Sequence, residues 1–278
     1  MVRIKYQNLN RSCSYSAIAN LMLDFSIDTE DYEILKSIKI PYIFNYLDKE
    51  DKFIAGPMLQ GKKWFDYYLI SYGLEFKEIE VQKNKALECF NANPNRFMVG
   101  LNMGNIGKHA VIFEGRQENN YQFLNIKRED SCEPDYYLFD SIELFNKLDD
   151  CFLVGWIEET NKSIALNNKH ELKKSVEHIK LYKKAVVDFC SENRNSIELA
   201  DAKSNLFEAF FLDVFSMMKI INELNLVKKI ECIRRDYINA MSTNPEHLIL
   251  SDYLKMDEFL KTIDSFQLLV EKEYKKSV

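Results

Sequence analysis

Hydrophobic and polar residues follow two patterns along the chain, and the pattern changes near residue 160. Before that point, short apolar runs rich in β-branched and aromatic residues are separated by glycine, asparagine, proline or charged residues. Runs of this length and composition are typical of β-strands. We predict strands at residues 96–103, 109–115, 121–126 and 151–158.

Helices are predicted before and between these strands. In residues 13–25 the apolar side chains recur at steps of three and four, which gives a helix one apolar face. These side chains are Ala17, Ile18, Leu21, Met22 and Phe25. We therefore expect this helix to pack against the sheet, and we predict further helices at residues 61–73, 83–92 and 141–149, the last with Ser141 as its N-cap.

Beyond residue 160 the pattern is helical throughout. Residues 169–190 place apolar side chains at helical spacing, and residues 198–225 and 251–275 show the same spacing. Ser251 is a candidate N-cap of the last segment. All eight glycines lie at or before Gly155, and Pro245 is the only proline in the last 123 residues. The sequence thus predicts an α+β fold with two domains, an α+β domain over residues 1–160 and an all-helical domain over residues 161–278.

Composition and charge exclude several classes of protein. The chain has 278 residues, of which 46% are hydrophobic and 29% charged, as in a globular protein. A net charge of −6 gives no reason to expect nucleic acid as a partner. No apolar run approaches the 18 residues of a membrane span, and residues 1–10 lack the apolar core of a signal peptide. We expect a cytoplasmic protein.

The six cysteines, at positions 13, 89, 132, 151, 190 and 232, are widely separated. They include no C-x-x-C pair, so neither a zinc clip nor a disulfide framework is indicated, and we expect no metal or cofactor. Five of them are expected to be small buried hydrophobic residues. Cys13 differs because it lies where a polar stretch gives way to the predicted helix at residues 13–25.

Cys13 and His109 together suggest nucleophilic chemistry. His109 begins the apolar strand at residues 109–115, directly after a glycine-rich turn, whereas His170, His178 and His247 have polar helical surroundings and are expected at the surface. A thiol attacks only as thiolate. The first turn of a helix stabilises negative charge, and a neighbouring imidazole can take the thiol proton.

Two further side chains complete a catalytic arrangement. Asn125 follows His109 by sixteen residues in the next predicted strand, where a tight hairpin brings it near the imidazole and lets it orient the ring. Asp130 and Asp140 are alternatives for this role. Gln7 precedes Cys13 by six residues and can donate a hydrogen bond to a developing oxyanion.

The order Gln7, Cys13, His109, Asn125, with Ser12 before the cysteine, resembles the papain-like cysteine peptidase superfamily. The short span between cysteine and histidine is similar to that of C39-type peptidases, although these usually have an Asp-Pro pair where this chain has Asn125-Ile126. The helical second domain, in a chain without transporter segments, resembles butirosin-type acyltransferases and the papain-fold amide synthetase of closthioamide assembly. The resemblance implies a papain-like domain, a carrier-protein thioester as acyl donor and an amine as acceptor.

Three functions are compatible with these residues. The first is a cysteine acyltransferase or amide synthetase of antibiotic biosynthesis, in which Cys13 takes an acyl group from a carrier protein and passes it to a small amine. The second is a C39-like peptidase that uses the same residues with water as acceptor. The third is a binding module that has lost catalysis. The helical domain has three candidate roles: to recognise the carrier, to cover the active site or to form a homodimer.

Overall fold

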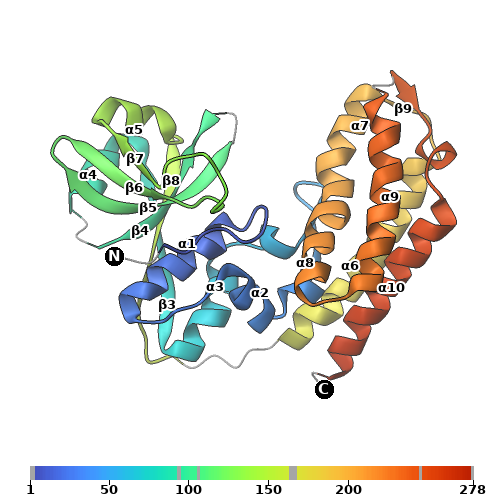
Figure 1. The fold of residues 1–278 in the computed structure, drawn as a ribbon, viewed down its shortest axis with the longest axis horizontal. Helices are drawn as coiled ribbons and strands as arrows, with labels where there is room; N and C mark the ends of the chain where they lie inside the picture. Colours follow the sequence, from blue (N-terminus) through green and yellow to red (C-terminus); the bar gives the residue numbers. More distant parts are fainter. Residues whose placement is uncertain (1–3, 93–94, 105–106, 163–167, 244–245, 277–278) are drawn as a thin grey trace. The chain divides into compact units, whose positions relative to one another are not determined.

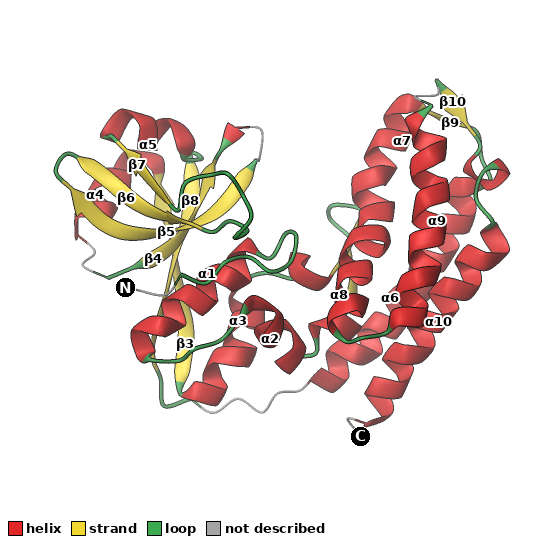
Figure 2. Ribbon diagram, viewed as in Figure 1, coloured by secondary structure: helices red, strands yellow, loops and turns green. Residues whose placement is uncertain are grey.

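The computed structural model describes residues 4–92, 95–104, 107–162, 168–243 and 246–276. Its internal contacts divide the chain into two compact units. The first unit comprises residues 1–34 and 60–165, and the second comprises residues 35–59 and 166–278. Residues 35–59, which the sequence placed in the first domain, thus belong to the second unit. The fold is α+β, with an antiparallel sheet in the first unit and a largely helical second unit (Figure 2).

The first unit contains a six-stranded antiparallel sheet with strand order β3-β8-β4-β5-β6-β7. The strands are β3 (Leu74–Gln82), β4 (Phe97–Asn102), β5 (Lys108–Gln117), β6 (Asn120–Asn125), β7 (Tyr136–Phe139) and β8 (Cys151–Glu159). The four predicted strands are confirmed as β4, β5, β6 and β8. The two edge strands were not predicted, since β3 exposes three consecutive residues, Glu78, Ile79 and Glu80, and β7 has only four residues.

Helices of the first unit lie against this sheet (Figure 1). They are α1 (Cys13–Met22), α3 (Lys62–Leu69), α4 (Ala86–Ala92) and α5 (Ser141–Lys147), and α2 (Asp31–Ser37) begins in this unit. Every residue of α1 after Cys13 is buried, and the helix contacts β5, β4 and β8, as predicted. Ser141 is not the N-cap of α5: Asp140 is, and its carboxylate forms a capping box with Glu143.

An aromatic core supports β5 and β6, the strands that carry His109 and Asn125. Phe90 of α4 lies 5.2 Å from Phe97, 5.2 Å from Phe113 and 5.7 Å from Phe123, measured between ring centroids. Each of these rings is at most 3% exposed. Aromatic contacts of this kind add to the free energy of burial. Phe113 of β5 and Phe123 of β6 are direct cross-strand partners, so the aromatic core holds the two strands in the register that continues to Val111 and Asn125.

The second unit is built from long and short helices together with a β-hairpin. The helices are α6 (Asn168–Cys190), α7 (Ser196–Ala202), α8 (Phe215–Ile220), α9 (Leu224–Ser242) and α10 (Met256–Lys276), with π-helical turns at Lys203–Phe207 and Ala209–Val214. The π-helical turns interrupt the helix predicted at residues 198–225. Ser251 is not a cap, because α10 begins at Met256. None of the helices described is both long and apolar enough to cross a membrane.

Residues 35–59 join the helical unit through the hairpin of β1 (Phe44–Leu47) and β2 (Lys52–Ala55). The Phe44 ring lies 5.1 Å from Tyr182, and its N–H donates to Ser175 Oγ at 3.0 Å. The N–H of Tyr46 donates to His178 Nδ1 at 3.0 Å. The expected surface position is therefore wrong for His178, which is half-buried with its pKa lowered chiefly by that burial. The periodicity of the sequence did not predict that residues 35–59 pack against the helical unit.

Candidate active site

Cys13 is the first residue of α1 and is partly buried. The carbonyl of Ser12 accepts the first helical hydrogen bond, from Ser16 N–H at 3.0 Å. The backbone N–H groups of Ser14 and Ala110 hydrogen-bond to the sulfur of Cys13. The thiol thus lies at the positive end of a buried helix, where negative charge is stabilised.

His109 is the second residue of β5 and hydrogen-bonds to Cys13. Burial raises the pKa of the Cys13 thiol, but the hydrogen bond to His109, the N–H groups and the imidazolium charge outweigh burial, so that its pKa is lowered. Burial lowers the pKa of His109, yet its interactions with Cys13 and Asn125 leave that pKa raised. The two shifts favour a thiolate–imidazolium pair.

Asn125 contacts the other side of the imidazole. Its Oδ1 lies 3.1 Å from His109 Nε2, which leaves Nδ1 for the contact with Cys13. The register explains the proximity: Val111 of β5 is opposite Asn125, so His109, two residues earlier on the same strand face, lies diagonally beside it. Asn125 is 1% exposed.

The two alternatives to Asn125 are engaged elsewhere. Asp130 is 75% exposed and pairs with Arg128 at 3.1 Å. Asp140 accepts hydrogen bonds from two N–H groups at the start of α5. The structure therefore brings Asn125, and not these carboxylates, to the imidazole.

A buried carboxylate holds the loop that leads into α1. Asp31 is fully buried and accepts hydrogen bonds from the hydroxyls of Ser12 and Ser16. It also accepts from the backbone N–H of Asn8 at 3.0 Å, from the Asn8 side chain at 2.9 Å and from the N–H of Tyr32 at 2.8 Å. Charged acceptors make stronger hydrogen bonds than neutral ones. Asp31 thereby fixes the chain on both sides of Ser12, next to the thiol.

Gln60 is a second support that the sequence did not indicate. Its Oε1 accepts from Ser14 Oγ at 2.8 Å, and its Nε2 donates to the Arg11 carbonyl at 3.4 Å. These contacts lie on either side of Cys13. A glutamine in a loop 47 positions further along the chain carries no local pattern that marks such a role.

Gln7 lies on the extended segment before α1. The side chain of Asn20 in α1 holds this segment by accepting from Lys5 N at 2.9 Å and donating to Lys5 O at 2.7 Å. The N–H of Gln7 donates to the Lys127 carbonyl at 2.8 Å. Gln7 therefore lies beside the segment that follows Asn125. Gln7 lines a polar hollow of about 380 Å³ together with Asn8, Arg128, Glu129 and Asp130. Its role as oxyanion donor stays a prediction.

The remaining cysteines differ from one another in burial. Only Cys190 is fully buried, whereas Cys132 and Cys232 are exposed, so the expected burial of all five was wrong. The pKa of Cys190 is raised to about 12 by burial, and that of Cys151 is raised by its hydrogen bond to Glu80. These environments favour the neutral thiol, which is a poor nucleophile.

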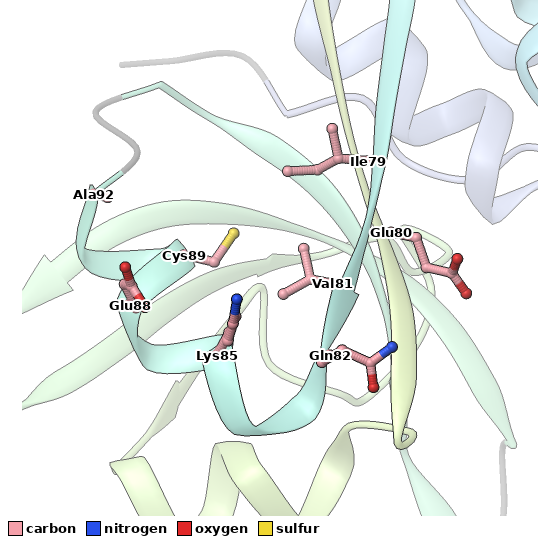
Figure 3. A pocket seen from close by; sticks show the side chains of 8 residues that line it. All are labelled: Ile79, Glu80, Val81, Gln82, Lys85, Glu88, Cys89 and Ala92. Carbon is pink, nitrogen blue, oxygen red and sulfur yellow. The ribbon is translucent and has the colours of Figure 1, made fainter.

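Cys89 lines a separate hollow of about 530 Å³ between β3 and α4 (Figure 3). The other lining residues are Ile79, Glu80, Val81, Gln82, Lys85, Glu88 and Ala92. Burial and the neighbouring charge of Glu88 raise the pKa of Cys89. No histidine lines this hollow, so it offers no imidazole to take the proton of a thiol nucleophile.

Comparison with known proteins gives a limited likeness. No family model and no curated protein matches the sequence. The peptidase domain of Streptococcus ComA, a bifunctional ABC transporter of a quorum-sensing pathway, is similar with a TM-score of 0.42 and 11% identity, over 58% of this chain and 100% of that one. A double-glycine motif protease from an AMS/PCAT transporter, solved with a leader peptide, has a TM-score of 0.40 and 10% identity, over 58% and 93% of the two chains. Likeness at this level does not define an activity.

The first prediction concerns the thiolate of Cys13. Because its pKa is lowered, the thiolate persists as the pH falls below about 8.5, where an unperturbed thiol becomes protonated. At about pH 6.5, iodoacetamide should modify Cys13 faster than the exposed Cys132. His109→Ala should lower the rate of Cys13 modification about tenfold or more. Peptide mass spectrometry resolves the two sites. A Cys13 rate that His109→Ala leaves unchanged would contradict the ion pair.

The second prediction concerns Asp31. Asp31→Ala leaves several buried donors without their acceptor, so the free energy of unfolding of the first unit should fall by about 2–4 kcal/mol. Both tryptophans, Trp64 and Trp156, lie in that unit, so their fluorescence in a urea titration follows it selectively. The exposed Asp130→Ala is the control and should cost about 0.5 kcal/mol or less. Equal costs for the two variants would show that Asp31 is not an anchor.

Proposed function

We propose that this protein is a cysteine-dependent acyl-transfer enzyme that forms a thioester on Cys13. The observation that carries the proposal is the contact of Cys13, His109 and Asn125 at the first turn of a buried helix, with the thiol pKa lowered and the imidazole pKa raised. This combination creates a nucleophile, a base that holds its proton and a group that orients the base. A purely structural cysteine has no need of it.

In the first half-reaction the Cys13 thiolate attacks the carbonyl carbon of the donor thioester. The negative charge that develops on the carbonyl oxygen is stabilised by the Cys13 backbone N–H and, in this proposal, by the Gln7 side-chain amide. When the intermediate collapses, the carbon–sulfur bond to the donor breaks, and the leaving thiolate takes the proton from His109. The products are acyl-Cys13, a neutral imidazole and the free donor thiol.

In the second half-reaction an amine attacks acyl-Cys13. Neutral His109 accepts the proton that the amine loses, and the bond between the carbonyl carbon and the Cys13 sulfur breaks. An amide is released, and the thiolate–imidazolium pair is restored. Asn125 keeps the ring in one orientation throughout, so the same nitrogen serves both proton transfers.

The donor and the acceptor are proposed on chemical grounds. Exchange of one thioester for another is nearly balanced in free energy, which suits a cysteine nucleophile. The sequence resemblance to butirosin-type acyltransferases and to the closthioamide amide synthetase supports a carrier-protein thioester as donor, a small amine as acceptor, and a cytoplasmic place in antibiotic biosynthesis. We propose that the helical unit recognises the carrier protein.

Intact-protein mass spectrometry with a small acyl thioester tests this function. We predict a mass increase of one acyl group that is absent in Cys13→Ala and reduced at least about tenfold in His109→Ala. Added amine should discharge the adduct to an amide faster than water hydrolyses it. Cys132→Ala is the control and should acylate like the wild type.

The possible outcomes separate the candidate functions. Discharge of the adduct by water, unaffected by amine, would replace the synthetase with a hydrolase. Cleavage of a peptide without any adduct from the thioester would favour a C39-like peptidase. No Cys13 adduct with either class of substrate would leave only the non-catalytic binding module.

A further inference from the structure

The amide group of Asn125 has a second set of partners on the side away from His109. Its Nδ2 lies 3.2 Å from Glu133 Oε2, 2.9 Å from the Pro134 carbonyl oxygen and 2.9 Å from the Tyr137 hydroxyl. Tyr137 in turn donates its hydroxyl proton to Glu133 Oε2 at 2.6 Å. Asn125 therefore lies between the imidazole and a carboxylate.

These partners determine which way the amide points. The Glu133 carboxylate and the Pro134 carbonyl can only accept, and the Tyr137 oxygen accepts because its proton is given to Glu133. The amide nitrogen must therefore face them, and Oδ1 must face His109. Since Oδ1 accepts, His109 Nε2 must carry a proton. The ring nitrogen at Cys13 is then the one that gains and loses a proton during catalysis.

We propose that Glu133 is a positioning residue that extends the Cys13–His109–Asn125 arrangement to a fourth member and stabilises the imidazolium through the Asn125 amide. The inference rests on the proposed function and deepens it. A negative charge behind the amide polarises it, so that Oδ1 becomes a better acceptor for the protonated ring. An asparagine at this position thus provides orientation, and the carboxylate beyond it provides charge.

The charged groups around Glu133 agree with this role. The hydrogen bond from Tyr137 lowers the pKa of Glu133 most, and the nearby charges of His109 and Lys127 act in the same direction, so Glu133 is ionised at neutral pH. Lys127 also donates to the Glu133 carbonyl at 2.6 Å and pairs with Asp135 at 3.0 Å. Part of its charge is therefore neutralised by Asp135, and Glu133 keeps its effect on the imidazole.

Glu133 also belongs to a loop that hydrogen bonds hold in place. Glu133 and Pro134 lie between β6 and β7, and the N–H of Asn125 donates to the Asp135 carbonyl at 2.8 Å. Both Asn125 and the loop are thus fixed by backbone and side-chain hydrogen bonds together. A test must separate this structural contribution from the effect of charge, and a change in pH dependence does so.

The test compares iodoacetate with iodoacetamide as reagents for Cys13. The anionic reagent is favoured only while His109 is protonated, so the ratio of the two rates falls as the imidazolium loses its proton. Glu133→Gln removes the charge and retains the size of the side chain. The pKa of His109 should then fall, and the decline of the ratio should move about 0.5 pH unit or more to lower pH. Tyr137→Phe should move it in the same direction by less.

Glu118→Gln is the matched control. Glu118 is exposed in the turn that joins β5 to β6. Glu118→Gln therefore removes one negative charge at the end of this hairpin that is opposite to His109 and Asn125. In Glu118→Gln the ratio of the two rates should decline at the same pH as in the wild type. If Glu133→Gln lowers both rates equally at every pH without moving the decline, Glu133 has only a structural role and the proposal fails. This readout needs no acyl substrate, so a failure of the Glu133 role can be distinguished from a failure of the proposed function.

Discussion

The chemistry that we propose for this protein depends on one proton shared between Cys13 and His109. Burial acts against both charged forms, raising the pKa of the thiol and lowering that of the imidazole. The pair is favoured only because each charge lies beside the other and beside backbone N–H groups or amide oxygens. A separation of a few ångströms would remove that balance, because a hydrogen bond weakens steeply with distance.

Much of the first unit can be understood as a means of keeping that separation fixed. The thiol is carried by a buried helix whose leading loop is held by Asp31 and Gln60. The imidazole is carried by β5, whose register with β6 is stabilised by the aromatic core around Phe90. Stability and reactivity are therefore coupled here, since the contacts that order the core also set the geometry of the pair.

Sequence patterns predicted the parts of the structure that depend on local rules. The central strands, helix α1 and the proximity of His109 to Asn125 follow from periodicity and from hairpin geometry. The edge strands and the packing of residues 35–59 with the helical unit do not, because they depend on contacts between distant segments. Gln60, Asp31 and Glu133 were missed for the same reason: each acts through partners that only the fold brings near.

The most direct test of the shared proton is an NMR pH titration of the His109 ring in the wild type and in Cys13→Ala. The thiolate raises the pKa of His109, and burial alone lowers it. Removing the thiol should therefore move the His109 pKa from above its ordinary value to a lower one. A His109 pKa that is the same with and without the sulfur would contradict the ion pair.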